Sequence, residues 1–299
     1  MDQPIIQSLW IGPRLSVMEQ LSIRSFLAHG HSFHLYTYQP VENIPAGTIV
    51  HSGNEILPER EIFSNQTRLG KGSFAGFADS FRYKLLLERG GWWSDLDCVC
   101  TRPLDFAEAH ILGYERRPKG VLYVNVAVIK APAGSRLMEH CWRVCEKVDH
   151  SSLLWGQTGP TLMHETVGTL DVPVRILGPT AFYPIDFWQT WQLIEEKQIP
   201  EDSYAIHLWH SQWRRGGLDP DAKYDSECIY EQLKRRHGVC SPSGAARGPS
   251  WLSIGRRRLK RLELSFRQWK RGGKQGESKS ADPELETVHD HRDRQRLAG

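Results

Sequence analysis

The pattern of apolar and polar positions predicts strands that alternate with helices. Apolar runs over 5–12, 34–38 and 120–130 are short and bounded by glycine or proline, as strands are. Longer stretches without internal proline over 16–29 and 75–89 predict helices. This alternation is typical of an α/β fold with a parallel sheet, which binds its ligands at the carboxyl ends of the strands.

Further signals extend this pattern on either side of the second helix. Ile49 and Val50 indicate a short third strand at an edge, and 135–148 has the spacing of an amphipathic helix. Residues 62–77 are polar and rich in glycine, which predicts a loop. It is not a Walker phosphate-binding loop, because the G-x-x-x-x-G-K-[ST] pattern is absent.

Two carboxylates follow the helix predicted over 75–89. Gly90 and Gly91 end the helix, and a strand that begins with two tryptophans leads to Asp95 and Asp97. In an extended strand, residues two apart face the same way. Two carboxylates so close are costly unless a cation lies between them, and Mg²⁺ or Mn²⁺ prefers such oxygens, with phosphates completing its shell. Most D-x-D pairs are solvated loop residues, so the surrounding sequence decides their meaning.

The residues around this pair form a long pattern with fixed spacing. The segment ADSFRYKLLLERGGWWSDLDCVC resembles the core of the DXD-motif glycosyltransferases of glycosyltransferase family 32. That group includes the yeast initiating mannosyltransferase, α-1,4-galactosyltransferases and bacterial capsule enzymes, and it shares its core with the clostridial glucosylating toxins. Trp93 stands where the family has tyrosine. The matching positions are Ala75, Ala78, Asp79, Arg82, Tyr83, Leu86, Gly90, Gly91, Trp93, Asp95 and Asp97.

The resemblance implies a catalytic domain of the GT-A type, with a Rossmann-like site for a nucleotide sugar. It implies transfer from a UDP- or GDP-sugar to a glycan or lipid-linked acceptor in polysaccharide biosynthesis, with Mn²⁺ or Mg²⁺ as the cofactor. It also implies retention of the anomeric configuration. No Asp or Glu stands out as a nucleophile, so we expect a same-face attack in which the leaving diphosphate acts as the base.

The first strand supplies candidates for binding the nucleotide. Family members begin with I-I-H-Q-x-W-x-G, and this chain has IIQSLWIG, with Gln7 where histidine is usual. By resemblance, Trp10 stacks on the base, while Ile11 and Gly12 line the uracil or guanine. The alternative is that Trp10 is an ordinary core residue.

The central helix supplies candidates for binding the sugar and its phosphate. Asp79 and Arg82 are three residues apart and share one helix face, and Tyr83 follows. By resemblance, Asp79 holds sugar hydroxyls and Arg82 the phosphate linked to the sugar, which suits a carboxylate and a guanidinium. Asp95 contacts the ribose, the donor sugar or the metal shell, and Asp97 binds the metal. An ordinary helical ion pair is the alternative for the first two residues.

Candidates in the second half of the chain also come from the resemblance. Asn125 matches an asparagine close to the donor sugar, although the family's later G-H-P is replaced by residues 133–135. The T-G-P turn at 158–160 lies under the acceptor side of the cleft in relatives; a purely structural turn is the alternative.

The sequence HLWHSQW supplies the candidates nearest the end of the domain. His207 is the first choice for a third metal ligand and His210 the second, because a neutral imidazole binds Mn²⁺ beside carboxylates. Trp209 and Trp213 match the family pattern and are donor-binding candidates. Residues 214–215, both arginine, are placed to clamp phosphate. A hydrogen-bonded structural histidine is the alternative for the metal ligand.

Composition narrows the class of protein and the cellular compartment in which it is expected to work. The 299 residues are 39% hydrophobic and 24% charged, which suits one globular domain, and no apolar run is long enough to cross a membrane. The start of the chain lacks the basic and apolar regions of a secretory signal, and its six cysteines are expected to be reduced thiols. These features predict a cytoplasmic enzyme of bacterial type.

The residues after position 240 differ in character from the rest. We predict a catalytic domain over 1–240, a small-residue linker over 241–249, a basic amphipathic helix over 250–272 and a disordered tail over 273–299. Residues 256–271 carry eight Lys or Arg against one Glu, a net of +7; since the whole chain is +3, the rest is −4. Such a helix suits the inner face of an anionic plasma membrane, and no nucleic acid is expected. A packed or dimerising helix is the alternative.

Two other functions remain open from sequence. A metal phosphohydrolase also uses a D-x-D, but it needs an apolar strand directly before the first Asp and acidic and lysine motifs downstream, whereas Ser94 precedes Asp95 here. The second is a non-catalytic sugar-binding module on a membrane. The aromatic residues of the chain would suit such a module, but the Asp-Arg pair and the D-x-D residues would then be unexplained. Hydrolysis of a nucleotide-sugar donor separates both from a transferase.

Overall fold

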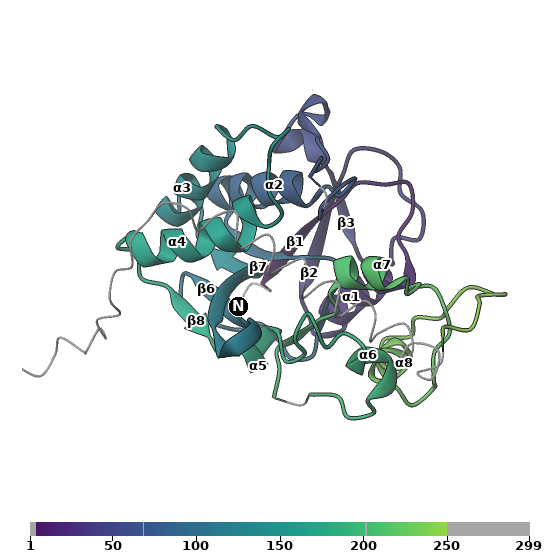
Figure 1. The fold of residues 1–299 in the computed structure, drawn as a ribbon. Coiled ribbons are helices and arrows are strands. Elements are labelled where there is room, and N and C mark those ends of the chain that lie inside the picture. Colours follow the sequence, from purple (N-terminus) through teal and green to yellow (C-terminus); the bar gives the residue numbers. More distant parts are fainter. Residues whose placement is uncertain (1–3, 68, 201, 250–299) are drawn as a thin grey trace, which may run out of the picture. The chain divides into compact units, whose positions relative to one another are not determined.

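A computed structural model describes residues 4–67, 69–200 and 202–249 of the chain (Figure 1). The predicted basic helix at 250–272 and the predicted tail at 273–299 lie outside the described residues. Within the described part, no helix is both long enough and apolar enough to cross a membrane.

A seven-stranded sheet with the order β3-β2-β1-β4-β7-β6-β8 forms the centre of the molecule. The expected α/β fold is therefore confirmed, but a wholly parallel sheet is wrong, because β7 runs antiparallel to both of its neighbours. A tight connection at 117–121 joins β6 to β7, and only antiparallel strands can be joined so closely. The strands are β1 (Ile5–Trp10), β2 (Ser32–Thr37), β3 (Ile49–Ser52), β4 (Gly91–Ser94), β6 (Ile111–Arg116), β7 (Leu122–Ala131) and β8 (Arg175–Leu177).

Two short strands form a separate antiparallel pair beside this sheet. In that pair β5 (Cys98–Cys100) lies against β9 (Ala205–His207), with Cys98 opposite His207. Residues more than a hundred positions apart are brought together in this way.

The three helices predicted within the described residues are confirmed as α1, α2 and α3. Ser16 caps the start of α1 through its side chain, and α2 ends at Gly90, which has a φ of +64°. A Cβ on Gly90 would also lie 2.5 Å from the backbone nitrogen of Ala133, so only glycine fits this turn. The helices are α1 (Val17–Ala28), α2 (Ala75–Arg89), α3 (Arg136–Cys145), α4 (Leu162–Thr169), α5 (Pro179–Phe182), α6 (Gln192–Glu195), α7 (His210–Gly216) and α8 (Ile229–Arg236).

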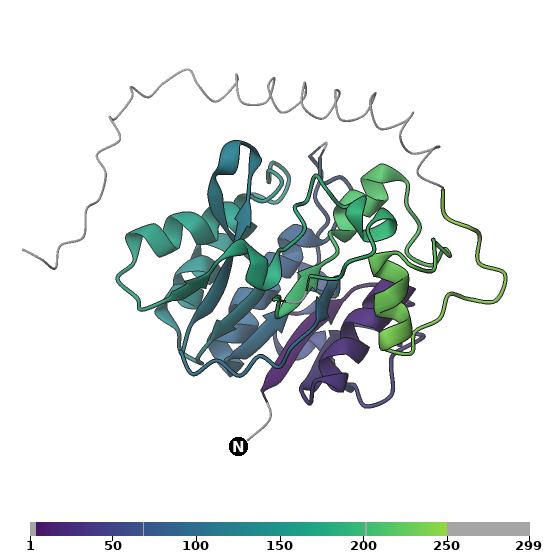
Figure 2. The same ribbon diagram turned by 90° about the horizontal axis from the view of Figure 1, so that it is seen from below.

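Both faces of the sheet are covered (Figures 1 and 2). Trp93 and Ile129 pack in the apolar cluster that includes side chains of α2, α3 and α4. Their chain neighbours Trp92 and Val128 pack in the opposite cluster, with α1 and β5. This alternation is the period of two of a strand, and it explains why both tryptophans are buried.

The sheet order creates a crevice between β1 and β4. The chain runs from β1 outward through β2 to β3 and then returns to β4 on the other side of β1. Because β1 and β4 are parallel neighbours whose connections leave in opposite directions, their carboxyl ends open a crevice, the usual ligand site of such sheets.

Candidate active site

A cavity of about 380 Å³ lies at the carboxyl ends of β1 and β4. Trp10 and Ile11 come from the end of β1, Asp95 and Asp97 follow β4, and His210 begins α7; all five line the cavity. The first turn of α2 completes the wall. The cavity therefore unites candidates from four separate parts of the chain.

The two aspartates lie in a turn rather than in a strand. The strand β4 ends at Ser94, and the segment from Asp95 to Asp97 turns toward β5. The expectation that both aspartates lie in one extended strand is therefore wrong, because the chain leaves the main sheet here and β5 pairs with β9. Both carboxylates line the same cavity, but they contact different partners.

Asp95 is paired with Arg82 at the base of the cavity. Its Oδ1 lies 3.2 Å from Nη1 of Arg82 and accepts a 2.7 Å hydrogen bond from Nε1 of Trp93. The guanidinium also donates to the backbone oxygens of Ala78 and Val126 and lies over the Trp93 ring, 5.0 Å from its centroid. Burial raises the pKa of Asp95, and the neighbouring Arg82 charge opposes that rise.

Asp79 and Tyr83 lie behind Arg82 and outside the cavity wall. Oδ1 of Asp79 is 3.3 Å from Nη2 of Arg82, and Oδ2 accepts a 2.9 Å hydrogen bond from Thr158. The Tyr83 hydroxyl donates to the backbone oxygen of Thr158 at 2.9 Å. Burial raises the pKa of Asp79 to about 6, against the effects of Arg82 and Thr158. These residues tie the T-G-P turn to α2.

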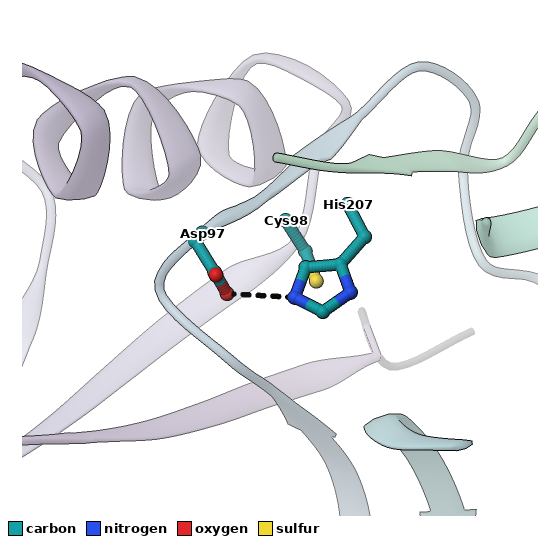
Figure 3. Close-up of side chains that lie close together, drawn as sticks. All are labelled: Asp97, Cys98 and His207. Carbon is teal, nitrogen blue, oxygen red and sulfur yellow. Dashed lines mark ion pairs between the residues drawn. The ribbon is translucent and has the colours of Figure 1, made fainter. Parts of the chain in front are cut away.

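Asp97 contacts both candidate histidines. Its Oδ1 lies 3.2 Å from Nε2 of His207 (Figure 3), and its Oδ2 accepts a 2.8 Å hydrogen bond from the backbone nitrogen of His210. The turn between the histidines depends on Trp209, which has a φ of +59°, a conformation rare for a bulky residue. The Trp209 indole donates to the backbone oxygen of Ile185 at 2.7 Å, which holds the turn in place.

Asp97, Cys98 and His207 can hold a metal ion. They offer ligand atoms within 4.8 Å of one another, and His207 Nδ1 is buried without a hydrogen-bond partner in the described part of the chain (Figure 3). Burial alone would raise the pKa of Asp97, but the His207 charge and hydrogen bond hold it well below its usual range. Burial alone would lower the pKa of His207, and Asp97 raises it overall.

Cys98 differs from the other two members of this group. Burial raises the pKa of its thiol well above the usual range, and the charges of Asp97 and Asp95 add to that effect. A protonated thiol is a poor ligand for a hard cation. The carboxylate and imidazole therefore fit a divalent cation better than the sulfur does.

Trp10 forms one wall of the cavity at the end of β1. Its Nε1 is buried without a hydrogen-bond partner among the described residues. Gly12 has a φ of +155°, and a Cβ there would lie 3.2 Å from Nε1 of Trp10. A small residue at position 12 therefore leaves room for the indole, while Ile11 itself lines the cavity.

Three other candidates lie outside the cavity wall. Asn125 is buried in β7, where it donates to Glu115 at 2.6 Å and accepts from the backbone nitrogen of Ala127. Trp213 is fully buried against Tyr230. Trp209 contacts the ring of His207, with 3.9 Å between their centroids. Of the three, Trp209 packs against the histidine that faces Asp97.

The structure adds residues that sequence analysis did not select as site residues. Glu19 lines the cavity, and burial raises its pKa while the charge of His210 opposes the rise. The S-x-x-E spacing from Ser16 to Glu19 signals a helix cap but not a buried carboxylate. Residues 72–74, before α2, also line the cavity. Arg214, which sequence analysis did expect to clamp phosphate, lines it as well.

A family model for the alpha 1,4-glycosyltransferase conserved region matches residues 131–241. The chain is a glycosyltransferase. The matched region covers a little over a third of the chain and contains both candidate histidines, whereas Asp95 and Asp97 precede it. No curated protein matches this glycosyltransferase by sequence.

A solved structure titled PaToxG Glycosyltransferase is similar to this glycosyltransferase. The TM-score is 0.41 and the sequence identity 12%, over 79% of this chain and 86% of that chain. A similarity of this degree carries no conclusion about the site. The chemistry of the site therefore rests on its own residues.

Proposed function

We propose that this glycosyltransferase moves a sugar from a UDP- or GDP-sugar to a glycan or lipid-linked acceptor, in a metal-dependent reaction that retains the anomeric configuration. One observation carries the proposal: a single cavity at the β1–β4 crevice is lined by Trp10, Arg82, Asp95, Asp97 and His210. An aromatic face, a guanidinium and two carboxylates are the groups that a base, a diphosphate and a divalent cation require.

Three residues that line this cavity would hold the donor: Trp10, Arg82 and Asp95. Trp10 stacks on the base at the end of β1, and Arg82 balances the negative charge of the diphosphate. In the described part of the chain, the Arg82 and Trp93 contacts of Asp95 both use Oδ1. Oδ2 is thus available for a hydroxyl of the ribose or of the sugar.

Asp97 and a histidine would hold the cation, Mn²⁺ or Mg²⁺. When bound, such an ion neutralises the charge that develops on the leaving diphosphate. His207 orients the Asp97 carboxylate from one side, and the backbone nitrogen of His210 orients it from the other. Asp97 is therefore held ready without a change of rotamer.

The carboxylates that line the cavity are already paired with other groups. This supports a reaction that retains the anomeric configuration without a nucleophile from the enzyme. Glu19, Asp95 and Asp97 are the carboxylates among the described cavity-lining residues. Asp95 is paired with Arg82, Asp97 with His207, and Glu19 with the start of α1. An attack on the sugar by any of them would break these contacts, so we favour same-face attack by the acceptor with the diphosphate as the base.

Donor hydrolysis tests the proposal directly. The full chain is incubated with UDP- and GDP-sugars in Mn²⁺, in Mg²⁺ and in EDTA, and release of nucleoside diphosphate is measured. We expect slow, metal-dependent release from one donor. Asp97→Asn should reduce it on the order of a hundredfold, because a bound cation supplies several kcal/mol of charge stabilisation.

The same assay separates the alternatives. A phosphohydrolase that cleaved the diphosphate of the donor would release a nucleoside monophosphate and a sugar phosphate rather than a nucleoside diphosphate. A non-catalytic sugar-binding module would release neither. The transferase proposal would be overturned if no donor of the panel released a nucleoside diphosphate and no donor raised the melting temperature of the protein.

The acceptor proposal extends to polysaccharide biosynthesis of the bacterial capsule type. It rests on the sequence resemblance and on the basic character of residues 256–271. If the enzyme reaches its acceptor at a membrane, the full chain should bind to anionic liposomes, and a variant truncated after residue 249 should not. Equal binding by the two proteins would remove the membrane from the proposal.

A further inference from the structure

Glu19 is a buried carboxylate in the wall of the nucleotide cavity. Its residue is 1% exposed, although it lines the cavity beside His210. A carboxylate is rarely buried so fully unless its oxygens are paired. The contacts of these two oxygens therefore indicate what Glu19 does.

The two oxygens have different partners. Oε2 accepts a 2.7 Å hydrogen bond from the backbone nitrogen of Ser16, and this contact belongs to the cap of α1. Oε1 lies 3.6 Å from Nδ1 of His210, at the start of α7. Capping needs one oxygen, and glutamine serves as well as glutamate. The cap thus leaves the contact with His210 unexplained.

His210 is attached to the metal-binding side of the cavity through its main chain. Its backbone nitrogen donates to Oδ2 of Asp97 at 2.8 Å, and the residue lines the cavity. His207, by contrast, lies outside the cavity wall and directs Nε2 at Asp97 itself. Of the two histidines, His210 is therefore the one that borders the cavity.

We propose that Glu19 is a positioning residue that accepts the Nδ1–H of His210 and so leaves Nε2 as a ligand for the divalent cation at Asp97. Histidines that bind metals nearly always present their second ring nitrogen to a carboxylate or a carbonyl. The present distance of 3.6 Å closes by a small movement of His210, whose side chain is 39% exposed. Such contacts often shorten when the ligand binds. The inference rests on the proposed function and refines its metal site.

Binding of Mn²⁺ to the full chain tests this role without any turnover. Free Mn²⁺ is measured by electron paramagnetic resonance during titration, with Mn²⁺ alone and with added UDP or GDP. Glu19→Gln keeps the size of the side chain and its capping oxygen but removes the charge. We expect it to weaken Mn²⁺ binding by about 10- to 100-fold, the usual effect of losing such a partner.

Ser16→Ala is the matched control, because it removes the side-chain half of the same cap and keeps the carboxylate of Glu19. We expect this variant to bind Mn²⁺ as the parent does. Equal binding by Glu19→Gln and the parent overturns the proposal, as does an equal loss in both variants. A parent chain that binds no Mn²⁺ overturns it too.

A second readout follows the histidine itself. Long-range ¹H–¹⁵N spectra of histidine-labelled protein, at a pH above the ordinary imidazole pKa of about 6.5, distinguish the two neutral tautomers. We expect His210 to carry its proton on Nδ1 in the parent and to lose that preference in Glu19→Gln. A proton on Nε2 in the parent overturns the proposal.

Failure of this inference is separable from failure of the proposed function. If the chain hydrolyses a donor but its binding of Mn²⁺ does not depend on Glu19, only the positioning role of Glu19 is overturned. If the chain hydrolyses no donor but its binding of Mn²⁺ still depends on Glu19, the transferase reaction is overturned and the positioning role remains.

Discussion

Arg82 and Asp95 form an ion pair at the base of the cavity, with 3.2 Å between Nη1 and Oδ1. The same guanidinium faces Asp79 at 3.3 Å, so one buried cation is shared between two carboxylates, of which Asp79 is itself buried. This arrangement makes Arg82 a residue on which both the stability of the chain and the proposed donor site depend.

Replacing Arg82 with methionine should therefore destabilise the chain strongly. Removing one partner of a buried ion pair typically costs about 3–5 kcal/mol, because the remaining charge stays buried. Urea unfolding measures the loss. Arg89→Met in the same helix is the control: its pair with Glu55 is exposed, and we expect less than about 1 kcal/mol. Adding Asp79→Asn should restore part of the stability of Arg82→Met. Equal midpoints for the two single variants would contradict a buried pair.

Trp10 should contribute to donor affinity rather than to turnover. Stacking of a base on an aromatic side chain is worth about 1–3 kcal/mol, so Trp10→Ala should raise the donor KM by about tenfold or more. Trp10→Phe keeps an aromatic face and should recover part of the loss. Steady-state kinetics with the donor found in the hydrolysis panel measures both constants. An unchanged KM would make Trp10 an ordinary core residue.

The T-G-P turn should depend on the small size of Gly159. A Cβ at this position would lie 2.9 Å from Oδ2 of Asp79, which already accepts a hydrogen bond from Thr158. Gly159→Ala should cost about 1–3 kcal/mol, as forced packing usually does. Gly168→Ala in α4 is the matched control, because nothing lies within 4 Å and alanine favours helices; we expect a gain of up to about 1 kcal/mol. Thermal unfolding that ranks the two variants in the opposite order would contradict this packing.

Stability should fall in mild acid because of His237. Burial lowers its pKa from 6.5 to about 4, with smaller contributions from the charges of His29 and Arg236. Between these two values the unfolded chain binds more protons than the folded chain, so stability present above about pH 6.5 is lost as the pH falls toward about 4. His237→Gln should flatten this part of the stability curve measured by urea unfolding. An identical slope in the variant would assign the acid sensitivity to other groups.

Much of the local structure could be predicted from the chain. The helix expected over 75–89 has those same bounds, because an uninterrupted apolar stripe precedes two glycines. The strands at 5–12 and 120–130 are also present, within a few residues. These elements depend on contacts between neighbours in sequence, which periodicity and capping report directly.

The direction of β7 and the geometry of the two aspartates were not predictable in the same way. Periodicity shows that 120–130 is a strand but does not show whether its neighbours run parallel to it. A D-x-D spacing is compatible with a strand or with a turn. Pairing of β5 with β9 decides between them, and that contact joins Cys98 to His207.

By itself, the sequence determined the α/β class, the central helix and the set of polar residues from which a site is built. Only the tertiary structure decided which of them share a cavity: it placed Asp97 between two histidines, Asp79 behind Arg82, and Glu19 beside His210. The physical reason is that helices and turns depend on residues a few positions apart. A site instead depends on strand pairing and burial, which link positions up to about two hundred residues apart and leave no periodic signal in the chain.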